Sequence, residues 1–384
     1  MVYSQICSWL DDFVDDNSPE ELLDTWDLTE WIEESEIIKL FEECVLPTYK
    51  NKKSRDDATT ILKSLIWEYY LYRRDLSLQT VVTDISGMNR VKQIVSSSQH
   101  SLDWHLEKYD LLTASEFSDV YGTLVARTNL IKNKISKPIS DGLLPQTVLL
   151  SKDDKLPATF WGMKYEPVVR DIYSKLTNCD VFAGLGRIKH SKLTNLAASP
   201  DGIVQSGNKI GRLLEIKAPI SRQLEDEIIP RQYYCQIQIQ LEVCDLEVAD
   251  YCECKLETVK NGVWKTGNIG PAFVGAVAVT GSITDYTTWK YVYSPLFDNT
   301  ENGREGAMNW RPDLSGTTLL EISCWQITGW QLITVRRNRR WWNTEGLPEY
   351  NRFWKDVFLA RSDPSFLAQM VDETIDPKVP LFID

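Results

Sequence analysis

The chain has 384 residues, of which 43% are hydrophobic and 25% are charged, a composition typical of a folded globular protein with one large or two smaller domains. Its 55 acidic residues outnumber its 42 basic residues and give a formal net charge of −13, which on its own argues against a nucleic-acid partner. However, residues 1–50 hold 14 acidic and two basic residues, whereas the remainder holds 41 acidic and 40 basic residues. The acidity therefore belongs to one segment.

Membrane and secretion signals are not evident in the sequence. No apolar run reaches the roughly 18 residues that a membrane-spanning helix needs, and four aspartates between residues 11 and 16 occupy the place of a signal peptide's apolar stretch. We therefore expect a soluble intracellular protein that is not secreted. The eight cysteines include no CxxC pair, which indicates reduced thiols, and the three dispersed histidines do not favour a zinc site.

Residues 1–100 are predicted to form an added N-terminal helical region. Ser18, Pro19 and Glu21 are typical of a helix start. Apolar residues between positions 31 and 45 recur at helical spacing, so the acidic residues would cover the outer faces of amphipathic helices. A further helix is expected over residues 57–73. The acidic leader, residues 1–50, could shield a basic cleft or bind a basic partner, or it could simply be a solubilising helical cap.

Helices and strands alternate from about residue 104 onward. A helix is expected after Thr113, and the other expected helices cover residues 160–176, 229–243 and 348–359. The expected strands cover residues 181–190, 195–204, 211–218, 248–257, 272–280, 289–293 and 325–336. This order predicts an α/β or α+β domain over residues 101–360, with a central mixed sheet flanked by helices, and a C-terminal tail over residues 361–384.

The segment 199–219 predicts a hairpin that carries chemistry. Asp201 borders its first strand, glycines suit its turn, and period-two alternation places Glu215 and Lys217 on one face of its second strand and Ile216 on the other. Carboxylates and a backbone carbonyl are the ligands that Mg²⁺ prefers, and a lysine can help to activate a metal-bound water. The pattern indicates hydrolysis of phosphodiesters. The alternative is a surface hairpin with an exposed Glu-x-Lys pair.

Five short motifs follow one another along the chain. They are Trp104-His105 with Thr113-Ala114-Ser115, Trp161-Gly162 with Tyr165-Glu166, Ser199-Pro200-Asp201-Gly202, Glu215-Ile216-Lys217, and Tyr233-Tyr234-Cys235-Gln236-Ile237-Gln238. In this order they resemble the lambda exonuclease type, or YqaJ viral recombinase family, of the PD-(D/E)xK nuclease superfamily. The resemblance spans about residues 104–355 and implies a restriction-endonuclease-like core.

The resemblance also implies roles for individual residues. Lys217 would activate water, and Gln236 would lie near the scissile phosphate, with Gln240 on the same helix face. Glu166 would ligate a metal directly or through water. The alternatives are a solvated carboxylate at Glu166 and a merely exposed amide at Gln236. The implied catalytic residues are Asp201, Glu215, Lys217, Glu166 and Gln236. The implied ligands of Mg²⁺ are Asp201, Glu215, Glu166 and the backbone carbonyl of Ile216, for two ions in all, with Mn²⁺ able to substitute.

The Thr-Ala-Ser motif implies a binding site for a 5′-terminal phosphate. Ser115, with Thr113 beside it, would contact the phosphate at the start of a helix. Relatives of this type carry an arginine seven residues before the serine, whereas this chain has Lys108. The positive charge persists, but the bidentate guanidinium is lost. A plain helix cap is the alternative role for Ser115.

A run of arginines and tryptophans near the C-terminus is this chain's own addition to the pattern. It comprises Arg336, Arg337, Arg339 and Arg340, followed by Trp341-Trp342. Arginines suit phosphate contacts, and tryptophans can stack on unpaired bases, so the run predicts a DNA-binding surface. The alternative is a solvated basic turn with both indoles in the core.

The function implied by the resemblance is a Mg²⁺-dependent DNA exonuclease. It would act in the 5′-to-3′ direction on duplex ends, for recombination, repair or replication of a viral or phage type, in the cytoplasm or nucleus of a host. The alternatives are a structure-selective DNA or RNA endonuclease of the same superfamily and, from another class, a non-catalytic DNA-end-binding protein. The implied partners are duplex ends, single-stranded DNA, a single-strand annealing protein and further copies of the chain, with no membrane.

Overall fold

A computed structural model describes most of the chain from residue 107 onward. The described residues are 42–43, 46–64, 83–94, 107–135, 158–224, 228–265, 270–282, 288–314 and 316–375. Most of the predicted N-terminal helical region and the Trp104-His105 motif lie outside them. Residues 52–64 are helical, which agrees with the first part of the helix expected over 57–73. No helix in these ranges combines the length and apolarity needed to cross a bilayer.

The strands form two sheets. The larger sheet has eight strands in the order β10-β8-β11-β7-β6-β5-β2, with β9 paired to β8, and the smaller sheet has the order β1-β4-β3. The pairs β6–β7 and β1–β4 are parallel and the others are antiparallel, so both sheets are mixed. The strands are β1 Leu112–Thr113, β2 Val181–Phe182, β3 Ile188–Lys189, β4 Leu196–Ala198, β5 Gly202–Val204, β6 Leu213–Lys217, β7 Val248–Thr258, β8 Phe273–Thr280, β9 Lys290–Tyr293, β10 Phe297–Asp298 and β11 Leu319–Arg336.

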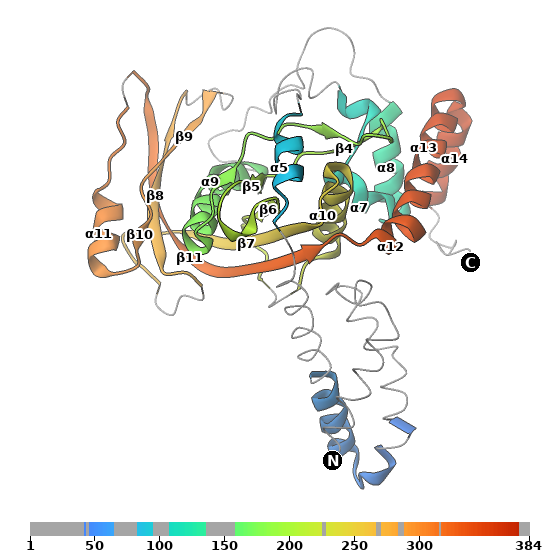
Figure 1. Cartoon of the computed structure of the whole chain (residues 1–384), viewed down its shortest axis with the longest axis horizontal. Coiled ribbons are helices and arrows are strands. Elements are labelled where there is room, and N and C mark those ends of the chain that lie inside the picture. The colour runs from blue at the N-terminus through green and yellow to red at the C-terminus, as the bar shows by residue number, and fades with distance from the viewer. Residues whose placement is uncertain are drawn as a thin grey trace.

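Helices surround the central strands, and α11 lies with β8–β10 at the opposite end of the molecule from α8, α13 and α14 (Figure 1). The α-helices are α5 Ile85–Lys92, α7 Phe117–Val120, α8 Leu124–Ile135, α9 Ala158–Thr177, α10 Arg231–Cys244, α11 Glu301–Asn309, α12 Arg339–Trp341, α13 Leu347–Ser362 and α14 Pro364–Ile375. The 3₁₀ turns are η1 Leu46–Thr48, η2 Lys108–Asp110, η3 Ala114–Glu116 and η4 Gly207–Lys209, and η6 Trp342–Gly346 is a π-helical turn.

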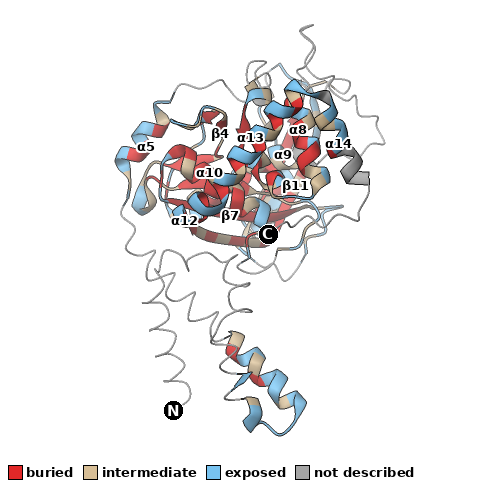
Figure 2. Ribbon diagram, turned by 90° about the vertical axis from the view of Figure 1, so that its right-hand side faces the viewer, coloured by how far each residue is buried: buried red, intermediate tan, exposed pale blue. Residues whose placement is uncertain are grey.

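Alternation along β6 joins two hydrophobic cores. Leu214 and Ile216 pack in one core with Tyr165 of α9, whereas Leu213 packs in the other core with Tyr234 of α10. Figure 2 shows that the helices around the sheet have buried inner faces and exposed outer faces. The prediction of a central mixed sheet flanked by helices is therefore confirmed.

The structure differs from the expected elements in a few places. The strand expected over 195–204 divides into β4 and β5, which belong to different sheets. The break falls at Pro200, which has no backbone N–H for a strand ladder. The strand expected over 325–336 begins earlier, at Leu319, and contains a register shift between Ile327 and Gly329. In the segment expected to be a C-terminal tail, α14 forms and buries Met370.

Candidate active site

The predicted hairpin is present as β5 and β6. Its turn uses Gly207 and Gly211, whose φ angles are +81° and +91°, values that side chains with a Cβ rarely adopt. A Cβ on Gly211 would also lie 2.5 Å from the backbone oxygen of Asp84. Asp201 immediately precedes β5, and its Oδ2 accepts a hydrogen bond of 2.7 Å from the backbone N–H of Ile216 in β6. The hairpin therefore holds the carboxylate of Asp201 against β6.

Glu215 is the centre of a buried polar network between β6 and α10. Its side chain is fully buried, and its Oε1 accepts hydrogen bonds from Lys217 Nζ and, at 2.7 Å, from Gln236 Nε2. Its Oε2 accepts a hydrogen bond of 2.6 Å from Gln240 Nε2. Lys217 Nζ also donates to Gln236 Oε1 at 3.1 Å. The shared face expected for Gln236 and Gln240 is confirmed, because both amides reach the same carboxylate.

The site gathers negative charge. Burial and the carboxylates of Glu215 and Glu166 hold the pKa of Asp201 well above its usual value. Burial also raises the pKa of Glu166, although Arg170, which forms an ion pair with it, opposes the shift. Burial alone would lower the pKa of Lys217, but the carboxylates of Glu215 and Asp201 outweigh it and raise that pKa. A bound cation would relieve this concentration of carboxylates.

The donor set fits a hard divalent cation. In the described part of the chain, no three His, Cys, Asp or Glu side chains are grouped closely enough to hold a metal by themselves. A metal here would therefore need the carbonyl of Ile216 and water beside Asp201 and Glu215. Glu215 accepts three described hydrogen bonds, and a carboxylate offers about four lone-pair sites, so it keeps capacity for a cation. Glu166 is held by Arg170 and would act from further out.

The Thr-Ala-Ser motif has a structural network of its own. The backbone N–H and hydroxyl of Thr113 donate to Glu116 Oε2 at 3.0 and 2.8 Å, and the buried Lys134 donates to the same oxygen at 2.8 Å. The hydroxyl of Ser115 lies 3.3 Å from that of Thr113, and Ser115 itself is exposed. Thr113 thus serves the capping box of a short 3₁₀ turn, and Ser115 is the member of the motif that faces outward. Lys108 lies in η2.

A small cavity joins this motif to the glutamines of α10. Its volume is about 80 Å³, and it is lined by Thr113, Ala114, Ser115, Arg187, Ser199, Gln236 and Gln240. Sequence reasoning brought Ser115 and Gln236 into one functional scheme, and the structure places them around one cavity. It did not find Arg187, which stands just before β3 and has no motif around it. The closeness of Arg187 to Ser115 and Gln236 depends on how the smaller sheet packs, and the sequence pattern contains no information about that packing.

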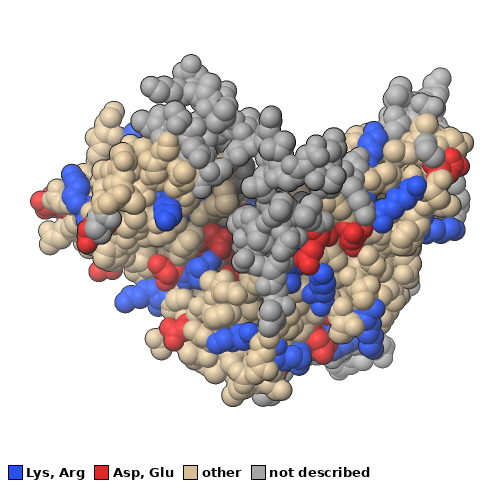
Figure 3. Space-filling view, turned by 90° about the horizontal axis from the view of Figure 1, so that it is seen from above, with Lys and Arg blue, Asp and Glu red and all other residues tan. Residues whose placement is uncertain are grey.

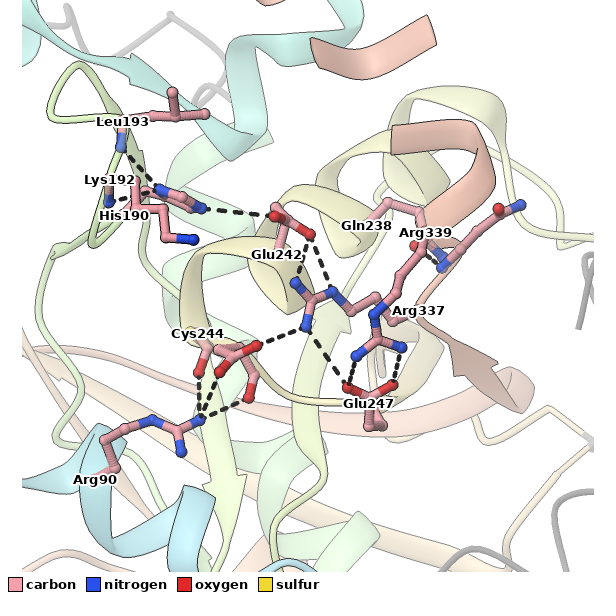
Figure 4. A network of polar contacts seen from close by, with 12 residues as sticks. Arg90, His190, Lys192, Leu193, Gln238, Glu242, Cys244, Glu247, Arg337 and Arg339 are labelled. Atoms are coloured by element: carbon pink, nitrogen blue, oxygen red, sulfur yellow. Dashed lines mark hydrogen bonds and ion pairs between the residues drawn. The ribbon is translucent and has the colours of Figure 1, made fainter. Parts of the chain in front are cut away.

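The basic run is largely engaged in a structural network (Figure 4). Arg337 lies between Glu242 and Asp245, with contacts of 2.6 and 2.8 Å, and its side chain is 9% exposed. Arg339 forms a two-pronged ion pair with Glu247. Their acidic partners come from the end of α10 and the turn that follows it. The positive charges of Arg337 and Arg339, which the sequence predicts to contact DNA, are thus neutralised by acidic residues of the protein itself.

The indole of Trp341 lies in the core, where it is not available to stack on bases. It is 5% exposed, and its ring centroid lies 6.1 Å from those of Phe117 and Tyr121 and 6.3 Å from that of Tyr234. Trp342 is buried as well. The structure thus matches the alternative of a basic turn with both indoles inside. DNA contact by Arg336 and Arg340 stays a prediction, and Figure 3 shows basic and acidic side chains intermixed over the described part of one face.

Replacing Arg337 by alanine is expected to lower the free energy of unfolding by about 2–3 kcal/mol, because it removes the guanidinium from the largely buried Glu242 and leaves that carboxylate with the contact from His190. The slope of DNA affinity against salt concentration should not change, since Arg337 would contact no phosphate. Arg340→Ala, from an exposed position of the same run, is the matched control. A reduced salt slope with unchanged stability in Arg337→Ala would contradict the structural role.

Comparisons with known proteins agree with these motifs. Residues 103–247 match the sequence model of a family described as the YqaJ-like viral recombinase domain. An uncharacterized protein of Acanthamoeba polyphaga mimivirus is 26% identical over 327 residues, which are 73% of this chain and 56% of the relative. The chain thus spans about half the length of the curated relative that it matches.

Solved structures of an alkaline exonuclease from Laribacter hongkongensis also align with this chain. The first aligns with a TM-score of 0.41 at 16% identity, over 71% of this chain and 100% of the exonuclease chain. A second structure of that enzyme, in complex with dAMP, aligns with a TM-score of 0.35 at 16% identity, over 71% of this chain and 94% of the other.

Proposed function

We propose that the protein, whose residues 103–247 match the sequence model of the YqaJ-like viral recombinase domain, is a metal-dependent DNA exonuclease that hydrolyses phosphodiester bonds from duplex ends. The observation that carries the proposal is the convergence of Asp201, Glu215 and Lys217, with two glutamine amides from α10 on the same carboxylate. A surface hairpin would leave Glu215 in water, whereas here it is fully buried.

The residues of the site suit attack by water on a phosphodiester. Asp201, Glu215 and the carbonyl of Ile216 would hold Mg²⁺, or Mn²⁺ in its place, and a second ion would lie toward Glu166. Such an ion lowers the pKa of bound water and offsets the charge that develops on the phosphate. Lys217 Nζ carries a positive charge beside Glu215 and would orient the water and the scissile phosphate. Gln236 accepts a hydrogen bond from Lys217 and donates one to Glu215, so it would fix the position of the ammonium relative to the carboxylate.

The proposal assigns the polarity and the end dependence of cleavage to the cavity beside Ser115. Because this cavity also reaches Gln236, a terminal phosphate held there would place the adjoining phosphodiester toward Glu215. The proposed direction is 5′ to 3′, with the 5′-phosphate in the cavity. A strand-annealing protein that coats the remaining 3′ strand and an assembly of several copies of the chain are further parts of the proposal.

The decisive experiment is digestion of linear duplex DNA, of the same duplex with capped ends and of covalently closed circles. In Mg²⁺ the linear duplex should be degraded stepwise, with the 5′ strand shortened first, while circles and capped ends remain intact. Addition of EDTA should stop degradation, because the carboxylates alone cannot activate water. Nicking of the circles would show the endonuclease alternative instead, and binding to ends without cleavage in Mg²⁺ or Mn²⁺ would show the non-catalytic one.

A further inference from the structure

An aromatic ring lies close to the ammonium of Lys217, in addition to its hydrogen-bond partners. Lys217 Nζ donates to Glu215 and, at 3.1 Å, to Gln236, which uses two of the three N–H donors of an ammonium group. The same nitrogen lies 4.7 Å from the centroid of the Tyr233 ring in α10, a distance at which the face of a ring attracts a cation. The stem of a lysine is long and flexible, so two hydrogen bonds at its end leave it room to move. Tyr233 therefore contacts a group that the proposed reaction needs in one position.

The ring of Tyr233 is supported by a second ring on β7. Its centroid lies 6.1 Å from that of Tyr251, and the two ring planes are inclined by 29°, which is a stacked arrangement. Tyr251 is fully buried, and its hydroxyl donates to Glu253 Oε2 at 2.9 Å. β7 is the parallel neighbour of β6, and Glu253 is paired in register with Lys217. The strand beside the one that bears Lys217 thus fixes the ring that contacts its ammonium.

Glu253 also fixes the loop that follows β6. It is fully buried, forms an ion pair with Arg222 of that loop and accepts a hydrogen bond of 2.6 Å from Gln331 Nε2. The guanidinium carbon of Arg222 lies 5.7 Å from the centroid of the Tyr233 ring. One buried carboxylate thus holds both Tyr251 and Arg222, which pack beside this ring.

The contacts of Tyr233 are made by its ring and not by its hydroxyl. Among the described residues, none shares a hydrogen bond with this hydroxyl, whereas two cations and one aromatic ring lie close to the ring itself. The next residue, Tyr234, is 1% exposed and belongs to the hydrophobic core, but Tyr233 is only half-buried. Its arrangement is therefore that of a ring which holds a cation, and phenylalanine could supply the same face.

We propose that Tyr233 is a positioning residue, which holds the ammonium of Lys217 beside Glu215 through the face of its ring. The inference rests on the proposed exonuclease function, in which Lys217 orients the water and the scissile phosphate. A displacement of about 1 Å in a reacting group can cost on the order of a hundredfold in rate. Tyr233 acts through Lys217 in this scheme and contacts neither the water nor the DNA.

The test compares kcat and KM for linear duplex DNA in Mg²⁺ among variants at position 233. Tyr233→Leu should lower kcat at least about tenfold and leave KM within about twofold, because the ring acts on the position of Lys217 and not on DNA binding. Tyr233→Phe keeps the ring and should rescue the loss. Tyr291→Leu, which removes a half-buried tyrosine of β9, is the matched control and should change neither constant.

The other kinetic outcomes overturn the assignment. An unchanged kcat in a folded Tyr233→Leu protein would show that the ring does not position Lys217. A Tyr233→Phe protein as slow as Tyr233→Leu would transfer the role to the hydroxyl. A rise in KM as large as the fall in kcat would show that Tyr233 contacts DNA instead. If Tyr233→Leu does not fold, Tyr233→Met, which is also apolar and lacks a ring, takes its place under the same criteria.

A spectroscopic measurement decides the role of the ring without any DNA. In protein labelled with ¹³C at the lysine Cε, the ring current of Tyr233 should move the signal of the Lys217 methylene protons upfield, and Lys217→Arg identifies that signal. Tyr233→Leu should return the signal downfield, and Tyr233→Phe should keep it in place. A signal that does not respond to Tyr233→Leu overturns the inference even in an active protein.

Failure of the exonuclease function has a different signature. A protein that degrades no duplex in Mg²⁺ or Mn²⁺ refutes that function, whatever the state of Lys217. If its Lys217 signal still responds to Tyr233→Leu and not to Tyr233→Phe, the ring holds the ammonium as inferred. If the signal responds to neither variant, the inference fails together with the function.

Discussion

Replacing Asp201 by asparagine is expected to lower the rate of DNA degradation at least about a thousandfold, a loss typical of removing a group that acts directly on the transition state. The substitution keeps an oxygen that can accept the hydrogen bond from the N–H of Ile216, so the hairpin should retain its shape. It removes a negative charge from a cluster that also contains Glu215 and Glu166. The proposed cation would then lose one of its two carboxylate ligands. Initial rates on a linear duplex in Mg²⁺ measure the effect.

Asp180→Asn is the matched control for this substitution. Asp180 stands beside β2, and its Oδ2 accepts a hydrogen bond from Ser206 that asparagine can also accept. The control should keep the original rate, and both variants should unfold at the original temperature. Full activity in a folded Asp201→Asn protein would defeat the assignment of the hairpin as the catalytic centre.

A large loss of stability is expected from Asp250→Ala, which should reduce the free energy of unfolding by about 3–5 kcal/mol. Asp250 lies on β7 and is fully buried. Its carboxylate accepts hydrogen bonds from Lys209 at 2.7 Å, Arg212 at 3.0 Å, Tyr173 at 2.8 Å and Thr334 at 2.9 Å. Alanine would leave two cations and two hydroxyls without their common acceptor. Urea unfolding at neutral pH gives the free-energy difference.

The same carboxylate predicts a dependence of stability on pH. Burial alone would raise the pKa of Asp250, but the cations of Lys209 and Arg212 outweigh burial and hold that pKa below its usual value of 3.8. A carboxyl group with a lowered pKa in the folded state stabilises the protein above its unfolded pKa. That contribution is lost as the pH falls through the lower, folded value. The stability difference between the unchanged protein and Asp250→Ala should therefore narrow in acid.

Thr334→Val supplies the control for this network. It removes one neutral donor to Asp250 and leaves both cations in place, so it should cost only about 1 kcal/mol. A loss in Asp250→Ala no larger than the loss in Thr334→Val would show that the buried carboxylate is not the centre of the network. A pH dependence unchanged by Asp250→Ala would contradict the lowered pKa.

Local patterns predicted the parts of the site that are themselves local. The hairpin, the shared face of Glu215 and Lys217, and the shared face of Gln236 and Gln240 all depend on spacing within one element. Strand and helix periodicity is sufficient to predict such relations. Arg187 escaped prediction because its place beside Gln240 depends on how the smaller sheet packs against α10.

The basic run at residues 336–340 shows what local patterns cannot predict. Arg337 and Arg339 look available in the sequence, because the acidic residues that hold them, including Glu242 and Glu247, are about 90 residues away. Trp341 likewise gains its core position from Phe117 and Tyr234. The pairing of distant segments decides whether a charge or a ring is available to a ligand, and periodicity contains no information about that pairing.

The aromatic core around Trp341 extends beyond the segment of the chain that matches the family. The family match ends at residue 247, yet the core beside α7 and α10 includes Trp341, Trp342 and Phe353. The match also ends just before β7. This strand is the parallel neighbour of β6, which bears Glu215 and Lys217. A fragment ending there would contain the proposed catalytic residues but would expose both the aromatic core and the edge of β6. The segment that matches the family is therefore shorter than the folded unit on which the proposed site depends.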